Sequence, residues 1–216
     1  MIQEDEPLNE QESLLIIQQM IHAAKQEQKD DGKGWILWGW LLFLTSLLTF
    51  VNVQYKWFST SFFWNGFGII SILFALFSSI RYFFFRKTSR VKTYTSDLFE
   101  KLNIGFFIFL AFIILAINLG VGPVKGFAFL IALYGFWILI YGTALNFRPS
   151  IIAAFITWII GFAALYIHKF VDADHEQFKW MMLVHALAVL CGYIIPGHLA
   201  NKEFNKQNKN VSIQRV

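Results

Sequence analysis

Charged side chains are scarce in this sequence of 216 residues, and they are missing altogether from long parts of it. They make up 15% of the residues, whereas soluble globular domains average about 25%, and hydrophobic residues reach 56%. No Asp, Glu, Lys or Arg occurs in six stretches of at least 20 residues, at positions 35–55, 57–80, 102–124, 126–147, 149–168 and 180–201. This composition excludes a water-soluble fold and indicates an integral membrane protein.

The alternation of apolar and polar residues that marks a membrane-spanning barrel is also missing. Positions 104–117 and 127–141 are apolar on every face, and each charge-free stretch reaches the roughly 20 residues with which a helix crosses about 30 Å of hydrocarbon. A helix satisfies its backbone hydrogen bonds within its own segment, as lipid requires. The sequence therefore predicts an all-α polytopic fold. We expect an N-terminal tail at 1–33, six transmembrane helices within 34–201 and a C-terminal tail at 202–216.

Cysteine is represented by Cys191 alone, so the chain can form no internal disulfide and no cysteine metal cluster. Residues 1–33 begin with Glu4, Asp5 and Glu6 and stay polar, which is unlike a cleaved secretory signal. No glycine-rich phosphate loop precedes the basic segment at 81–101. We expect no catalytic, cofactor-binding or metal-binding set, no cofactor and no nucleic-acid partner.

Lys and Arg are distributed unevenly between the two sides that six spans would define. One side, which holds both termini, carries 14 of these residues, and the other carries Lys56, Lys125, Lys169 and Lys179. By the positive-inside rule, the basic side is cytoplasmic. The sequence thus predicts a multi-pass protein of a bacterial inner membrane with both termini in the cytoplasm.

The N-terminal tail carries the pattern of an amphipathic helix at about 10–30. Asn9 and Glu12 have the spacing of a capping box, and apolar residues then recur at three- and four-residue steps. This apolar face comprises Leu14, Ile17, Met20, Ile21 and Ala24. Residues 1–33 hold eight acidic residues against three Lys, a balance that disfavours docking on anionic lipid. We expect the face to contact a protein partner or a second copy of the chain, or its own cytoplasmic loops.

Polar residues inside the predicted spans are the usual candidates for function. They lie in an outer layer, with Asn65, Asn118 and His185, and in an inner layer, with Asn146, Arg148 and His198. They either form hydrogen bonds between helices or line a passage for an uncharged solute. No charged residue lies at a predicted bilayer centre, which argues against ion-coupled pumping.

The segment 185–192, His-Ala-Leu-Ala-Val-Leu-Cys-Gly, resembles the last catalytic helix of rhomboid intramembrane proteases. That chemistry needs a serine on another span within reach of the histidine. The fourth predicted span offers only Gly142, Thr143 and Ala144, near the opposite end of the bilayer from His185. The sequence therefore disfavours a protease.

Close packing is predicted for the fifth and sixth spans, where small residues recur at four-residue steps. They are Ala153, Thr157 and Gly161 on one span and Ala188 and Gly192 on the other. Pro196 follows on the sixth span and should kink it or end it early, because proline removes a backbone donor.

Several short motifs are distributed along nearly the whole chain: Glu12-Ser13-Leu14, Met20-Ile21, Ala24-Lys25, Trp38-Gly39-Trp40, Phe147-Arg148-Pro149 and Gly192-Tyr193-Ile194-Ile195-Pro196-Gly197. Together they resemble a family of uncharacterised bacterial six-span integral membrane proteins of about 200 residues. The resemblance implies a bacterial inner-membrane location and brings no activity with it.

Two classes of function remain open. The first is a non-catalytic membrane component that contacts a partner or a second copy through the N-terminal helix. The alternative is a passive carrier or pore for a small uncharged or lipid-like substrate, lined by Asn65, Asn118 and His185. The bilayer is the expected partner in both cases.

Overall fold

The computed structural model describes residues 31–85 and 94–213, and within them the chain is all-helical, without a strand. The predicted N-terminal amphipathic helix with its face of Leu14, Ile17, Met20, Ile21 and Ala24 lies outside the described residues. Residues 31–33 open the described part. The Lys33 amide donates to Asp31 Oδ1 (3.0 Å) and the Lys33 ammonium lies 3.3 Å from Oδ2, so these contacts lower the pKa of the Asp31 carboxyl.

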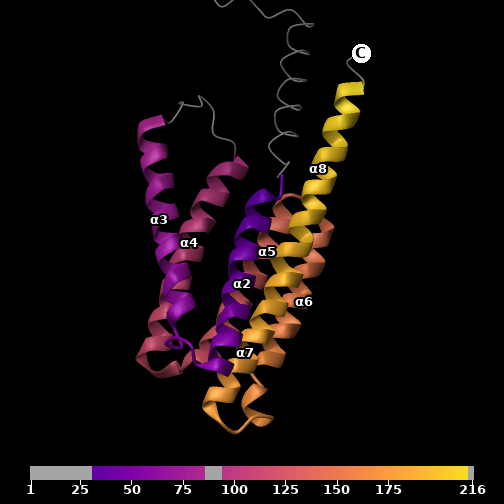
Figure 1. Cartoon of the computed structure of the whole chain (residues 1–216). Coiled ribbons are helices and arrows are strands. Elements are labelled where there is room, and N and C mark those ends of the chain that lie inside the picture. The colour runs from indigo at the N-terminus through magenta and orange to yellow at the C-terminus, as the bar shows by residue number, and fades with distance from the viewer. Residues whose placement is uncertain (1–30, 86–93, 214–216) are drawn as a thin grey trace, which may run out of the picture. The chain divides into compact units, whose positions relative to one another are not determined.

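The helices follow one another with short connections (Figure 1). Their order is α2 (Lys33–Tyr55), α3 (Phe62–Phe85), α4 (Tyr94–Ala116) with a π-turn η1 (Ile117–Val121), α5 (Pro123–Ala144), α6 (Arg148–Ala164), a 3-10 turn η2 (Ile167–Lys169), α7 (Asp174–Val189), a π-turn η3 (Leu190–Ile194) and α8 (Ile195–Ile213). The segment from α7 to α8 runs on as one long helix. Successive long helices are antiparallel.

Among the described residues, four helical segments are long and apolar enough to cross a bilayer: Lys33–Tyr55, Phe99–Val121, Pro123–Ala144 and Asp174–Lys206. The fifth predicted span is shorter, because α6 has 17 residues and then breaks into a turn. The second predicted span overlaps α3, in which the described residues form the shorter apolar segment Phe62–Phe74. Several long apolar helices are therefore present, as in membrane proteins.

Some helix boundaries differ from those predicted. The second helix begins at Phe62 rather than at residue 57, after a loop that Asn52 holds in place. The third and fourth predicted spans, 102–124 and 126–147, meet at a turn before Lys125, because α5 already begins at Pro123. The turn before it is made by Gly120 (φ 124°) and Gly122 (φ 81°), backbone conformations that only glycine adopts readily. Pro123 then fits the first turn of α5, where its missing N–H has no partner to lose.

The C-terminal part of the chain also departs from expectation. Pro196 does not end the sixth helix, which continues to Ile213 and includes most of the predicted tail. The wider π-turn at Leu190–Ile194 directly precedes the proline. Such a turn accommodates the backbone group that proline leaves unpaired, and the helix can therefore resume.

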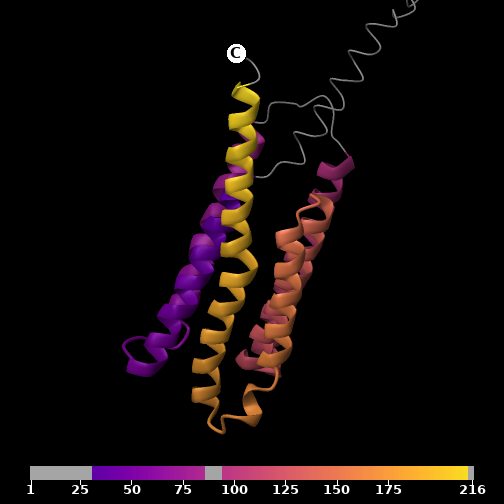
Figure 2. The ribbon, with the colours of Figure 1, turned by 90° about the vertical axis from the view of Figure 1, so that its right-hand side faces the viewer.

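The α7–α8 helix lies between two groups of helices. Figure 2 shows α2 and α3 on one side of it and α4, α5 and α6 on the other. Residue contacts agree, since α7 packs on α2, α5 and α6, while α3 packs on α2 and α4 on α5. The central helix is the most enclosed, with Met181, Met182 and Val189 fully buried. Along α4, among the side chains described from residue 99 onward, only Ile113 is buried.

Small residues let the helix backbones approach closely at this centre. A Cβ on Gly192 would lie 2.7 Å from Thr157 Oγ1, so the predicted contact between the small residues of α6 and the sixth span is confirmed. A Cβ on Gly39 of α2 would lie 2.8 Å from Ile194 Cγ1 and 3.0 Å from Tyr193 Cβ. The α2 helix therefore meets η3 at a glycine that has no room for a side chain.

We expect Gly39→Ala to lower the stability of the protein by about 1–3 kcal/mol, the usual cost of overpacking a close contact. Gly66→Ala is the matched control, because a Cβ there meets nothing within 4 Å and alanine is the better helix former. Thermal unfolding in detergent measures both changes. Equal melting of the Gly39 variant and the parent would contradict this packing.

Candidate functional site

The interior of the bundle holds a small set of buried polar side chains. They are Ser46, Thr49, Asn52, Ser150, Thr157, Lys179 and His185. Three of them, Ser46, Thr49 and Asn52, recur at three-residue steps on α2, the helix that packs on α7. This polar face of α2 is the first candidate for a site.

Ser46 of α2 and His185 of α7 lie at the centre of the contact between these two helices. The Ser46 Oγ lies 2.8 Å from His185 Nδ1 and 2.8 Å from the backbone oxygen of Leu42. A hydroxyl has one proton, so Ser46 donates either to the imidazole or to the Leu42 carbonyl, and in the second case His185 Nδ1–H is the donor. In both cases the pair links α2 to α7.

Aromatic rings surround the other side of the imidazole. The ring centres of Trp64, Phe127 and Tyr134 lie 5.4, 5.3 and 5.7 Å from that of His185, at interplanar angles of 80°, 88° and 68°. Nε2 of His185 is buried and has no hydrogen-bond partner among the described residues. Near-perpendicular rings at this distance let the edge of one ring meet the π face of another, a weak but favourable contact. The surroundings of His185 are thus aromatic and closed.

A serine beside a histidine is the pairing used in nucleophilic catalysis, but this pair has no access to a substrate. Both Ser46 and His185 are 0% exposed. Ser46 also lies within a regular helix and bonds its own preceding turn. The geometry supports a structural link between α2 and α7. Sequence analysis missed Ser46, and its regular spacing with Thr49 and Asn52 in an apolar span was the available signal.

A second polar cluster ties the end of α2 to the start of α7. The Asn52 amide donates to the backbone oxygens of Phe58 (3.2 Å) and Ser59 (3.1 Å), and its oxygen accepts from the Phe58 amide (2.8 Å). Lys179, only 8% exposed, donates to Gln54 Oε1 (2.9 Å) and pairs with Glu176. These bonds satisfy polar groups that would be costly to bury alone. The cluster stabilises the loop between α2 and α3.

The structure does not bring the predicted polar residues together. Asn65 and Asn118 are exposed and bond to residues four positions earlier, Asn65 to Ser61 Oγ in the turn before α3 (3.5 Å) and Asn118 to the Ile114 oxygen of α4 (2.7 Å). Only His185 of the outer layer is buried. In the inner layer, Asn146 (φ 50°) forms the turn before α6, and it is exposed, as are Arg148 and His198. No hydrogen bond joins the Arg148 or His198 side chain to another described residue.

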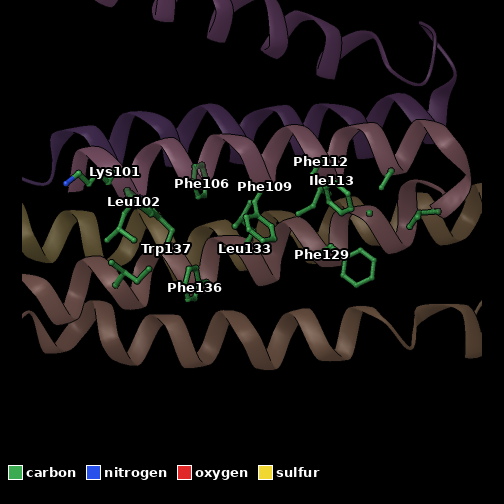
Figure 3. Close-up of a pocket in the computed structure, with 15 residues that line it drawn as sticks. Lys101, Leu102, Phe106, Phe109, Phe112, Ile113, Phe129, Leu133, Phe136 and Trp137 are labelled. Atoms are coloured by element: carbon green, nitrogen blue, oxygen red, sulfur yellow. The ribbon is translucent and has the colours of Figure 1, made fainter. Parts of the chain in front are cut away.

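The second candidate is an open groove between α4 and α5, with a volume of about 760 Å³ (Figure 3). That volume lies within the roughly 300–1,000 Å³ of small-molecule sites. Its lining includes Phe106, Phe109, Phe112, Phe129 and Trp137, and all other lining residues are apolar or glycine except Lys101. Figure 3 shows Lys101 at one end of the row and Phe129 near the other.

Two contacts and a glycine shape the groove between α4 and α5. A Cβ on Gly126 of α5 would collide with Ile117, so the chain is closely packed there. The rings of Phe106, in the middle of α4, and Trp137 of α5 are 5.2 Å apart. Next to Phe106, Gly105 contributes no side chain, and a Cβ there would meet nothing within 4 Å. The groove is therefore open at Gly105, on the Lys101 side of Phe106.

Comparison of the chain with protein-family models, with curated proteins and with solved structures finds no match. The two candidate sites are therefore the basis on which a function can be proposed. The buried pair is closed to ligands, whereas the groove is open, sizeable and chemically uniform.

We expect Ser46→Ala to destabilise the protein by about 1 kcal/mol, since it leaves the His185 ring with both nitrogens unpaired. Adding His185→Phe should restore most of this loss, because two apolar partners need no hydrogen bond. Ser71→Ala is the control, since its hydroxyl bonds only Phe67 of its own helix (2.8 Å). Thermal unfolding of the parent, the two single variants and the double variant measures the coupling, and Ser71→Ala is unfolded beside them. Strict additivity of the two substitutions would contradict the link.

Proposed function

We propose that this chain is a non-catalytic protein of a bacterial inner membrane that crosses the bilayer six times, with both termini in the cytoplasm. The support is the alternation of antiparallel helices together with the split of 14 basic residues against 4 between the two sides. In this arrangement α6 spans by its 17 residues and the η2 turn that follows, at the lower limit of length for a spanning helix.

Within the membrane, we propose that the protein binds one lipid-like molecule in the groove between α4 and α5. The observation that carries this proposal is an open groove of about 760 Å³ that is lined almost entirely by apolar side chains. A polar solute would lose its hydration there without gaining hydrogen bonds, whereas a hydrocarbon chain would lose nothing. The groove therefore favours the lipid-like class among the substrates of a passive carrier.

An axial pore finds less support in the bundle. The centre is filled by large side chains with no exposed surface, among them Ile131, Ile138 and Met182. Asn65 and Asn118 are exposed on α3 and η1 rather than grouped around His185. A lateral site on the surface of the bundle fits these positions better than a passage through it.

Filling the groove should abolish binding. We expect Gly105→Phe to reduce labelling of α4 and α5 by a lipid with a photoreactive acyl chain about tenfold or more, a change of roughly 1.4 kcal/mol. Gly66→Phe is the control, because it adds the same ring in open space on α3. Mass spectrometry of the labelled peptides measures the difference. Equal labelling of both variants, or none in the parent, would refute the groove as a binding site.

The second candidate function is contact with a protein partner through the N-terminal tail. Its support lies in the sequence, in the apolar face of Leu14, Ile17, Met20, Ile21 and Ala24 and in the acidic balance of residues 1–33. The two functions are compatible, since the tail and the groove are formed by different parts of the chain.

Removal of residues 1–31 should leave membrane insertion intact and abolish a crosslink to the partner or to a second copy. Two double variants distinguish the contribution of the apolar face from that of the rest of the tail. Ile17→Ser and Met20→Ser together should weaken the crosslink, because they remove apolar contact area, whereas Gln18→Ser and Gln19→Ser should not. Quantitative crosslinking in membranes measures the yield. An unchanged set of crosslinked products after the deletion would reject this function.

A further inference from the structure

We propose that the ligand of the α4–α5 groove is an anionic phospholipid of the cytoplasmic leaflet, with an acyl chain in the groove and its phosphate at Lys101. This inference rests on the proposed function of the groove and names the chemical class of the ligand.

The charge of the groove is confined to one place. Among the described residues, Lys101 is the one charged residue that lines the groove, and its side chain is exposed at the end of the row (Figure 3). An ammonium group binds a phosphate oxygen through a short charge-assisted hydrogen bond. The neighbouring Glu100 is not among the residues that line the groove. The polar end of the groove therefore favours an anion.

The groove is long enough along α4 to hold an acyl chain. At about 1.5 Å per residue, the lining positions on α4 from Lys101 to Ala116 extend over roughly 22 Å, and half of the hydrocarbon core measures about 15 Å. An acyl chain whose phosphate is bound at Lys101 can thus lie in the groove over the depth of one leaflet. The exposed surface of α4 leaves the side of the groove open to the surrounding lipid.

The position of Lys101 selects the leaflet. In the sequence it follows Arg86, Lys87, Arg90 and Lys92, which belong to the connection assigned to the cytoplasmic side. Anionic lipids of the cytoplasmic leaflet gather at such basic segments. A phospholipid phosphate at this depth is accordingly the available anion, and a soluble phosphate would bring no chain to fill the apolar part.

The test uses the full-length protein in nanodiscs that contain trace amounts of photoreactive phosphatidylglycerol or phosphatidylcholine with identical acyl chains. We expect the anionic lipid to label α4 and α5 about fivefold more than the zwitterionic lipid, the factor that corresponds to roughly 1 kcal/mol for one Lys near anionic lipid. Lys101→Gln should remove this preference but keep the labelling by phosphatidylcholine, which also reports that the variant is folded. Lys101→Arg should restore the preference.

Lys125→Gln is the matched control, since it removes one positive charge at the opposite end of α5 and lies outside the groove lining. It should leave the preference unchanged. Equal labelling of the parent by the two lipids, or a preference that survives Lys101→Gln, would overturn the inference while the groove stayed a lipid site. Displacement of the lipid by inorganic phosphate would also overturn it. An absence of any label on α4 and α5 would overturn the proposed function as well.

Discussion

Close approach of helix backbones around the α7–α8 helix is the constraint on which the rest of the structure depends. Lipid tails are as apolar as the side chains that face them, so burial alone does not hold such helices together, and van der Waals packing must do so. The contacts lie at positions without a large side chain, at Gly39 against η3 and at Gly192 against Thr157. Each would be lost if a bulkier residue separated the helices.

Polar contacts fix the register in which the packed helices lie against each other. The bond between Ser46 and His185 and the cluster around Asn52 and Lys179 all join α2 to α7 or to the adjoining loop. Apolar surfaces can slide along each other, whereas hydrogen bonds between particular atoms are satisfied in one register only. The burial that makes the Ser46–His185 pair useful for this purpose also closes it to any substrate.

Function is assigned to the part of the bundle where packing is incomplete. Ile117 packs on Gly126 and Phe106 on Trp137, while the groove between α4 and α5 stays open at Gly105. A rigid centre beside a partly packed edge suits a protein that holds a lipid at its side. In the complex that we propose, the charge of Lys101 orients a molecule that the apolar lining would accept in either direction.

The sequence by itself determined the all-helical class, because runs without charge can satisfy their backbone only as helices in lipid. It also predicted the small-residue contact of α6 with the sixth span, since spacing along a helix defines which residues share a face. Only the tertiary structure decided that Ser46 faces His185, that Asn65 and Asn118 lie apart on the surface, and that Lys101 ends a groove. Those facts depend on the rotation of each helix and on the distance between neighbours, which nearly uniform apolar sequences do not specify.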